Sequence, residues 1–246
     1  MTAQVGVHAL WRAGSGGGGG RWRELPGWLI VPLAFGAGAV PFSNLAAKIL
    51  RGVDLRTVGT GTVSGTGLYR VAGVGPLVAA GLLEVAKGAV GPALCGPGRP
   101  RMAAFASAAA VAGHNWSPFL RGAGGRGISP AIGALLVTSP AGSAALLGGM
   151  AAGRMAGETA LGSLAGDLVA VVLSRRLHGA EAGMVAVAVL VPMVAKRLAG
   201  NRRAPSGSRT YLWRLIFDRD CSRPGESLLG ASSVPSGLKL SAGARP

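Results

Sequence analysis

The feature that most constrains this chain is a series of long apolar segments separated by short polar loops rich in basic residues and glycine. Of its 246 residues, 49% are hydrophobic and only 14% are charged, whereas a soluble domain carries about 25% charged residues. The 43 glycines suit helices that pack closely in lipid, because small residues let backbones approach each other. This pattern predicts an all-α, polytopic membrane protein.

We expect apolar segments at residues 28–50, 68–94, 102–111, 128–153, 158–173 and 184–194. The region 128–153 is open to two interpretations. It forms one long span, or two short helices broken at Ser139-Pro140, because a residue before proline resists the helical conformation. With the break the chain has about seven transmembrane helices, and without it six.

The distribution of basic residues favours the break. With seven segments, the side that carries more positive charge holds Arg51, Arg56, Arg121, Arg126, Arg154, Lys196, Arg197, Arg202 and Arg203. The other side holds Arg21, Arg23, Arg99, Arg101, Arg175 and Arg176. Positive residues favour the cytoplasmic side, so we expect the N-terminus outside, and the C-terminus and both polar loops in the cytoplasm. With six segments the basic C-terminal cluster would lie outside.

Composition divides the chain into three parts. Residues 1–24 are basic and contain the run Gly16 to Gly20, which predicts a flexible arm. Residues 25–200 form the membrane domain, and residues 201–246 form a polar tail that we expect to be poorly ordered. The net charge of +16 is explained by membrane orientation and anionic headgroups, so no nucleic acid is expected. Two cysteines form no metal-type cluster, and we expect no metal and no cofactor.

The first polar loop runs from Arg51 to Thr66 and is rich in Gly, Thr and Ser. Its glycine spacing is not that of a dinucleotide-binding fingerprint. Small residues still expose backbone N–H groups, which can hold an anion. Arg56 and Arg70 flank the glycine-rich part, and arginine can bind a phosphate with two parallel hydrogen bonds. Taken alone, the loop is better explained as a flexible turn between two apolar segments.

Glu84 and Lys87 lie in the middle of an apolar segment. Being three residues apart, they share one face of a helix. Charges inside an apolar segment are costly and are therefore candidates for function, with Lys87 reaching a phosphate and Glu84 positioning it. The alternative is a local ion pair near a helix end.

The second polar loop, Gly113 to Gly127, contains His114, Arg121 and Arg126. His114 is a candidate general base or a ligand of a phosphoryl oxygen; the alternative is a hydrogen-bonded structural histidine. No Gly-x-Ser-x-Gly elbow and no Cys/His nucleophile pair occurs in the sequence. Direct transfer between two bound substrates therefore suits these residues better than a covalent intermediate.

Taken in order, these motifs resemble a known family, the bacterial membrane glycerol-3-phosphate acyltransferases that use acyl-phosphate as donor (the PlsY family). The resemblance runs from Gly36 to Gly200. Its motifs are Val40-Pro41-Phe42 with Val53-Asp54-Leu55-Arg56, then Gly59 to Arg70, then Leu83-Glu84-Val85-Ala86-Lys87-Gly88, and finally Gly113-His114 with Gly124-Gly125-Arg126-Gly127. The resemblance implies a seven-helix membrane domain whose site faces the cytoplasm.

The chain departs from the family pattern at several positions. Ala39 stands where the first motif has serine, and Ser43 is nearby but not equivalent. Two asparagines of the second motif are replaced by Thr62 and Gly67. The acidic residue of the third motif is Glu84 in place of aspartate, the first lysine of the last motif is Ala123, and residues 184–194 lack the family's histidine and asparagine.

The resemblance implies transfer of an acyl group from acyl-phosphate to the 1-hydroxyl of glycerol 3-phosphate, which gives lysophosphatidate for phospholipid synthesis in a bacterial plasma membrane. We expect His114, Lys87 and Arg56 to be catalytic. We expect the substrates to be bound by Gly59, Thr60, Gly61, Thr62, Ser64, Thr66, Arg70, Glu84, Gly124, Gly125 and Arg126. The alternative is a catalytically degenerate paralogue that binds a phosphorylated lipid precursor or partners another lipid enzyme. A small transporter is less consistent, because few polar residues lie within the apolar segments.

Overall fold

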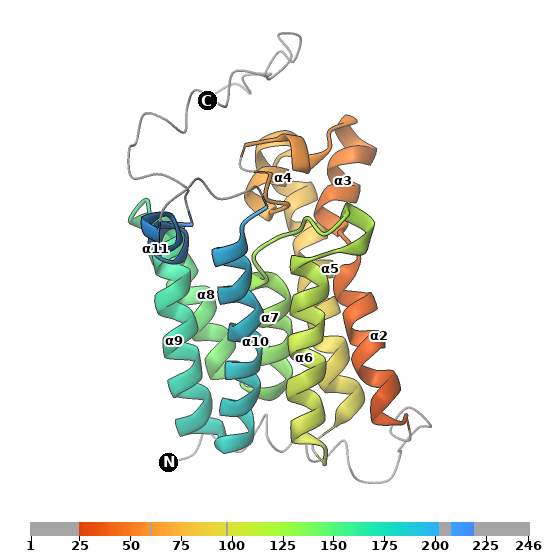
Figure 1. Ribbon diagram of the computed structural model, residues 1–246, viewed down its shortest axis with the longest axis vertical. Helices are drawn as coiled ribbons and strands as arrows, with labels where there is room; N and C mark the ends of the chain where they lie inside the picture. The colour runs from red at the N-terminus through yellow and green to blue at the C-terminus, as the bar shows by residue number, and fades with distance from the viewer. Residues whose placement is uncertain (1–24, 60, 97, 202–207, 219–246) are drawn as a thin grey trace.

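The computed structural model describes residues 25–59, 61–96, 98–201 and 208–218, and within them every regular element is a helix. Figure 1 shows long helices standing side by side in one bundle. In chain order the elements are α2 (Gly27–Ala39), α3 (Phe42–Arg51), η2 (Leu55–Thr57), α4 (Gly65–Ala72), α5 (Val74–Cys95), α6 (Pro100–Asn115), η3 (Pro118–Leu120), α7 (Ile128–Thr138), α8 (Pro140–Met155), α9 (Thr159–His178), α10 (Ala180–Ala199) and α11 (Ser208–Phe217). The predicted all-α class is confirmed for this part of the chain.

Among the described residues, three helical segments are long and apolar enough to cross a membrane: Gly27–Arg51, Val74–Cys95 and Ala180–Ala199. Many large apolar side chains on the outside of the bundle are exposed, including Leu82 and Val191. Outward-facing apolar residues of this kind suit contact with lipid. The larger number of about seven spans stays a prediction.

Two prolines set helix boundaries within the predicted apolar segments. Helix α2 ends at Ala39 and α3 begins at Phe42, with Pro41 between them. Helix α7 ends at Thr138 and α8 begins at Pro140, so the region 128–153 forms two helices. The Ser139 hydroxyl caps the second of these, because its Oγ accepts a hydrogen bond of 3.1 Å from the Gly142 N–H. A proline has no N–H to continue the preceding helix, which explains both breaks.

Other boundaries differ from the expected ones. The expected segment 68–94 is divided, since Gly73 has a φ of +84° and separates α4 from α5. Glycine tolerates this left-handed backbone because it has no Cβ. Helices α6 and α10 are longer than the expected segments 102–111 and 184–194. As a consequence, His114 lies in the last turn of α6 and Lys196 in the last turn of α10.

Glycines allow several helix pairs to touch backbone to backbone. A Cβ added at Gly38 on α2 would lie 2.0 Å from the Ala110 carbonyl oxygen on α6. A Cβ at Gly88 on α5 would lie 2.0 Å from the Pro130 carbonyl oxygen on α7. Close approach through small residues is a common way for helices to associate in lipid, where no hydrophobic effect drives them together. These contacts fix the positions of the helices that carry the polar groups described below.

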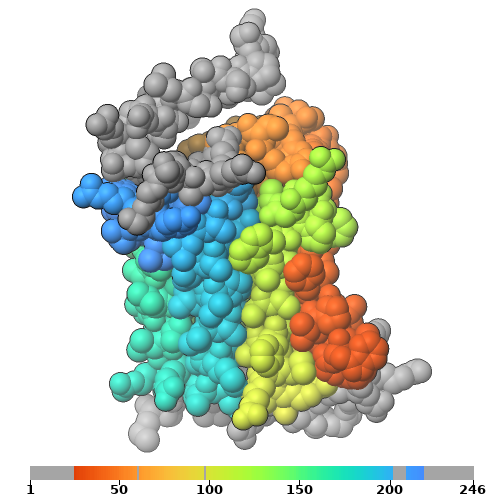
Figure 2. All heavy atoms as spheres, viewed as in Figure 1, coloured from red at the N-terminus to blue at the C-terminus, as the bar shows by residue number. Residues whose placement is uncertain are grey.

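The two polar loops meet at one end of the bundle. The Val63 N–H donates a 3.1 Å hydrogen bond to the Gly124 carbonyl oxygen. The Asn201 side-chain amide, just beyond α10, donates to the carbonyl oxygens of Gly61 at 3.1 Å and Gly124 at 2.9 Å. Figures 1 and 2 show this end at the top, with the first loop in orange and the second in yellow-green. Which side of a membrane this end faces stays a prediction.

Helix α11 lies inside the segment 201–246 that we expected to be poorly ordered. Its Arg214 guanidinium donates to the carbonyl oxygens of Leu198 at 3.0 Å and Ala199 at 2.8 Å. These carbonyls belong to the last turn of α10, where a helix has no partners of its own for them. The amino-acid composition of residues 201–246 does not reveal that Arg214 attaches α11 to the end of α10. The predicted arm 1–24 and residues 219–246 lie outside the described residues.

Candidate active site

Glu84 lies at the centre of a buried polar cluster. It sits on α5 with only 2% of its surface exposed. Its Oε1 accepts hydrogen bonds from the Ser43 N–H at 3.1 Å and from the Ser43 hydroxyl at 3.3 Å. Its Oε2 lies 2.5 Å from Lys87 Nζ and 3.1 Å from His114 Nδ1. The carboxylate therefore joins three elements, α3, α5 and α6, through paired and hydrogen-bonded charges, as a buried charge requires.

Lys87 is the buried cation that pairs with Glu84 in this cluster. Its Nζ pairs with Glu84 and donates a 2.7 Å hydrogen bond to the Val40 carbonyl oxygen, in the break between α2 and α3. The ammonium also lies 5.8 Å from the centre of the Phe42 ring. Lys87 is 4% exposed and does not line the cavity described next. In this arrangement it supports Glu84, and a direct contact with substrate stays a prediction.

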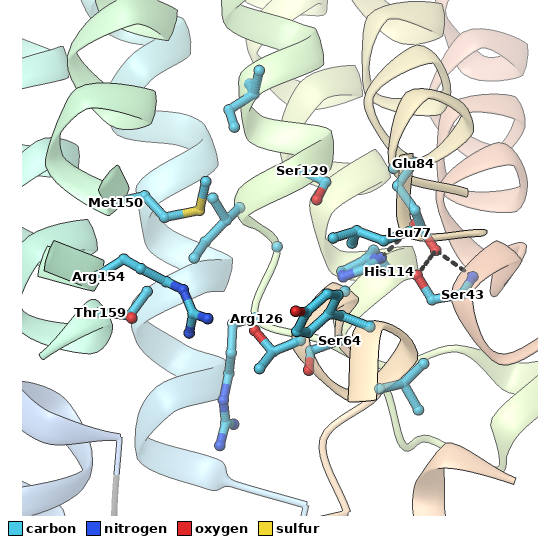
Figure 3. Close-up of a pocket in the computed structure, with 18 of the residues that line it drawn as sticks. Ser43, Ser64, Leu77, Glu84, His114, Arg126, Ser129, Met150, Arg154 and Thr159 are labelled. Carbon is cyan, nitrogen blue, oxygen red and sulfur yellow. Dashed lines mark hydrogen bonds and ion pairs between the residues drawn. The ribbon is translucent and has the colours of Figure 1, made fainter. Parts of the chain in front are cut away.

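A cavity of about 480 Å³ opens beside the cluster, between the first loop and helices α5, α7 and α8. Figure 3 shows Ser43, Glu84 and His114 together on one side of it, and Met150, Arg154 and Thr159 on the other. Its polar lining consists of Ser43, Ser64, Thr66, Tyr69, Glu84, His114, Arg126, Ser129, Arg154 and Thr159. Apolar side chains such as Leu77, Ile132 and Met150 complete the wall. The cavity can thus hold both a charged group and an apolar one.

The hydrogen bonds around Glu84 fix the state of His114. An ionised carboxylate only accepts hydrogen bonds, so the Nδ1 facing Glu84 Oε2 carries the proton. When the ring is neutral, Nε2 is then its unprotonated nitrogen. A carboxylate that orients a histidine in this way leaves the other ring nitrogen ready to accept a proton. The cavity-lining His114 therefore has the arrangement of a general base.

The first loop contributes the start of helix α4 to the cavity. The Ser64 hydroxyl caps this helix by accepting a 3.2 Å hydrogen bond from the Gly67 N–H. Ser64, Gly65 and Thr66 line the cavity, so the positive end of a helix faces it. Gly59, Gly61 and Thr62 do not belong to the lining, and Thr60 lies outside the described residues. The Gly61 carbonyl oxygen instead joins the loop to Asn201.

Arg56 and Arg70, which flank this loop in sequence, do not line the cavity. The Arg56 guanidinium pairs with Asp54 at 2.6 Å and contacts the Leu120 carbonyl oxygen at 3.4 Å. Hydrogen bonding to Arg56 holds the pKa of Asp54 well below its usual range, with help from Lys48. Arg70 is exposed on α4. That Arg56 and Arg70 bind phosphate therefore stays a prediction.

The second loop brings Arg126 to the cavity, while Gly124 and Gly125 pack against His114. A Cβ at Gly124 would lie 2.2 Å from the His114 carbonyl oxygen, and a Cβ at Gly125 would lie 2.1 Å from His114 Nε2. Neither glycine lines the cavity. Both positions therefore require glycine because the loop backbone touches the end of α6. Of the residues from Gly124 to Gly127, Arg126 and Gly127 line the cavity.

Sequence reasoning missed several residues of the cavity. Ser43 was noticed only as a neighbour of Ala39, yet its backbone and hydroxyl both hold Glu84. Arg154 was counted only as an orientation charge, and Thr159 was not singled out, although both line the cavity. No described carboxylate pairs with Arg154. A sequence motif does not show which distant helix end lies opposite it in the fold. No local signal in the sequence therefore identifies Arg154 and Thr159.

Together these features define a class, a helical membrane protein with a carboxylate–histidine pair beside a cavity lined by arginines. Residues 28–203 match the family model described as glycerol-3-phosphate acyltransferase. The chain belongs to the glycerol-3-phosphate acyltransferase family, as the sequence motifs predicted.

Relatives and a solved structure agree with this membership. The chain is 38% identical over 130 residues to a glycerol-3-phosphate acyltransferase of Halalkalibacterium halodurans, covering 51% of this chain and 62% of the relative. It is 39% identical over 148 residues to one of Myxococcus xanthus, covering 58% and 76%. The match to the first thus spans less than two thirds of that relative's length.

The fold is also similar to a crystal structure of PlsY (YgiH), described as an integral membrane glycerol 3-phosphate acyltransferase in its glycerol 3-phosphate form. The TM-score is 0.65 with 22% sequence identity, over 82% of this chain and 98% of the other. At this identity the similarity concerns the fold. Within the described residues, no three His, Cys, Asp or Glu side chains are grouped as a metal ion would need.

Proposed function

We propose that this protein transfers an acyl group from acyl-phosphate to the 1-hydroxyl of glycerol 3-phosphate and so makes lysophosphatidate. The observation that carries the proposal is the Glu84–His114 pair at the cavity wall, in a chain of the glycerol-3-phosphate acyltransferase family. The hydroxyl oxygen attacks the acyl carbonyl carbon, and His114 Nε2 takes the hydroxyl proton. A new C–O ester bond forms, the acyl C–O bond to phosphate breaks, and inorganic phosphate leaves with the electron pair.

Binding of two phosphorylated substrates suits the charges around the cavity. Arg126 and Arg154 line it, and the start of α4 adds the partial positive charge of a helix N-terminus. These groups can hold phosphate oxygens and stabilise the negative charge that develops on the carbonyl oxygen. Lys87 acts through Glu84 in this proposal. Arg56 and Arg70 stay predicted phosphate ligands. Because neither lines the cavity, the first polar loop would have to change its conformation before they could contact the substrate.

We also propose that the end of the bundle with the two loops faces the cytoplasm of a bacterial cell, with the start of α2 outside. Figure 1 shows α2 beginning and α10 ending at opposite ends of the bundle. Both polar loops and the basic last turn of α10 lie at the same end. An excess of Lys and Arg on one side favours the cytoplasm for that side.

The direct test is acyl transfer by purified protein in detergent, from palmitoyl-phosphate to labelled glycerol 3-phosphate. His114→Ala is expected to lower the rate about 10²- to 10⁴-fold, the usual contribution of a general base. His178→Ala is the matched control, because this histidine contacts Ser139 at the other end of the bundle, and its rate should stay unchanged. A palmitoyl thioester of the same chain length should not replace the acyl-phosphate.

Three results would count against the proposal: a folded protein that gives no product, a His114→Ala variant with normal turnover, or equal use of the thioester. If the folded protein gives no product but is thermally stabilised by glycerol 3-phosphate, the degenerate paralogue becomes the better account. Stabilisation by ligand is expected from any compound that binds only the folded state.

Gly125→Ala is expected to lower turnover about 10²-fold, because small displacements of catalytic groups cost that much. The added Cβ would lie 2.1 Å from His114 Nε2 and 2.8 Å from the Val63 carbonyl oxygen, so the imidazole must move away from its position beside Glu84. Acyl transfer and the thermal unfolding midpoint are measured together. Gly36→Ala on α2 is the control, since nothing lies within 4 Å of its Cβ position. Normal turnover of Gly125→Ala would show that the position of His114 is unimportant.

A further inference from the structure

A segment beyond the region matched by the family contacts Arg126, one of the residues that line the cavity. The family match ends at residue 203, whereas α11 covers Ser208–Phe217 and is followed by Asp218. Arg214 anchors the helix to the end of α10, and the Arg197 guanidinium donates to the Leu215 carbonyl oxygen at 3.3 Å. Figure 1 shows α11 at the same end of the bundle as the two loops. The segment therefore ends next to the proposed substrate site.

Both carboxylate oxygens of Asp218 contact the guanidinium group of Arg126. Arg126 Nε donates to Asp218 Oδ2 at 2.8 Å, and Arg126 Nη2 lies 2.8 Å from Asp218 Oδ1. The remaining Nη1 donates to the Lys196 carbonyl oxygen at 3.0 Å. Carboxylate and phosphate offer the same pair of acceptor oxygens to the planar fork of an arginine. In this structure the carboxylate of Asp218 thus occupies the edge of Arg126 that would bind a phosphate.

The backbone and the exposure of this pair suit reversible contact. Asp218 has a φ of +55°, a left-handed conformation that aspartate tolerates better than most residues, and its N–H donates to the Arg214 carbonyl oxygen at 3.0 Å. The side chains of Arg126 and Asp218 are 14% and 24% exposed. Because water reaches both, the pair can open without leaving a charge buried and unpaired.

We propose that Asp218 competes with the phosphate group of glycerol 3-phosphate for Arg126, so that the C-terminal helix sets the affinity of the cavity for phosphate monoesters. This inference rests on the proposed function, in which Arg126 binds a substrate phosphate. Asp218 is then a specificity-determining residue, because an anion must outcompete its carboxylate to enter. The other interpretation is that Asp218 only holds Arg126 in position, which predicts the opposite effect of removing it.

The test is equilibrium binding of labelled glycerol 3-phosphate to the full chain in detergent, at fixed ionic strength. Asp218→Asn keeps the shape but removes the charge, and is expected to lower Kd about two- to fivefold, the range set by a partly exposed ion pair. KM for glycerol 3-phosphate should fall by the same factor with kcat unchanged. Asp218→Glu keeps a carboxylate and should keep the native Kd. Thermal unfolding midpoints confirm that each variant is folded.

Two controls separate competition from general charge effects. Glu181→Gln makes the same change of charge on an exposed residue in the first turn of α10, at the other end of the bundle, and should leave Kd unchanged. In an Arg126→Gln background, Asp218→Asn should give no gain. A gain that persists without Arg126, an equal gain in Glu181→Gln, an unchanged or raised Kd in Asp218→Asn, or no binding by either protein would overturn the proposal.

This experiment separates the inference from the proposed reaction, because binding needs no turnover. If Kd falls as expected in a protein that transfers no acyl group, competition at Arg126 stands and the reaction fails. If acyl transfer occurs but Asp218→Asn has the native Kd and KM, the reaction stands and the competition is rejected.

Discussion

Replacing Glu84 by alanine is expected to abolish acyl transfer and to lower the free energy of unfolding by about 3–5 kcal/mol, the cost of breaking a buried ion pair. The variant leaves the Lys87 ammonium buried without a carboxylate, with the Val40 carbonyl oxygen and the Phe42 ring as the partners described above. It also leaves Ser43 and His114 without their shared acceptor. Denaturant unfolding in detergent and the acyl-transfer assay measure the two effects.

A second variant distinguishes the loss of stability from the loss of catalysis. Glu84→Gln with Lys87→Met removes both charges at nearly constant volume, so most of the stability should return. Acyl transfer should not return, because a neutral amide orients and stabilises the protonated His114 less well than a carboxylate. Glu181→Ala, an exposed residue of α10, is the control and should change neither quantity. A Glu84→Ala protein as stable as this control would contradict the described cluster.

Gly133→Ala is expected to destabilise the protein by at least about 1–3 kcal/mol, the usual cost of overpacking, because the clash is with backbone. The added Cβ would lie 1.8 Å from the Val85 carbonyl oxygen and 3.1 Å from the Ala89 nitrogen. Helices α5 and α7 would have to separate at this point. Since α5 carries Glu84, and both helices line the cavity, acyl transfer should fall together with stability.

The matched control for this prediction is Gly148→Ala on α8, where nothing lies within 4 Å of the Cβ position. An alanine there also favours the helical conformation, so stability should stay the same or rise slightly. Thermal unfolding midpoints of both variants in the same detergent give the comparison. Equal midpoints for Gly133→Ala, Gly148→Ala and the native chain would show that α5 and α7 do not meet backbone to backbone.

Part of the candidate site could be predicted from sequence because its chemistry is local. Glu84 and Lys87 stand out as charges within an apolar segment, and their spacing of three residues already places them on one helix face. His114 stands out because it follows an apolar run and opens a basic, glycine-rich loop. The structure brings Glu84 and His114 within hydrogen-bonding distance and adds Ser43.

The arginines show the limit of that reasoning. Arg56 and Arg126 look equivalent in sequence, since each adjoins a glycine-rich loop. In the structure Arg56 pairs with Asp54, two residues away, and Arg126 lines the cavity. Arg154, which no motif indicates, lines it too. Which cation reaches a cavity depends on contacts between distant segments, and sequence spacing carries no information on those.

By itself the sequence determined the helical architecture, the break at Ser139-Pro140, the family and the loops that hold the chemistry, because hydrophobicity, backbone restriction and motif spacing all act within a few residues. The break at Pro41, inside the expected segment 28–50, appeared only in the structure. Only the tertiary structure decided that Ser43 and Lys87 hold Glu84 from different sides, that glycines let α5 and α7 touch, and that Asp218 faces Arg126. The Ser43–Glu84 pairing spans 41 residues of sequence, and the Arg126–Asp218 pairing spans 92. Their energies come from burial and charge pairing, which exist only once the helices have packed.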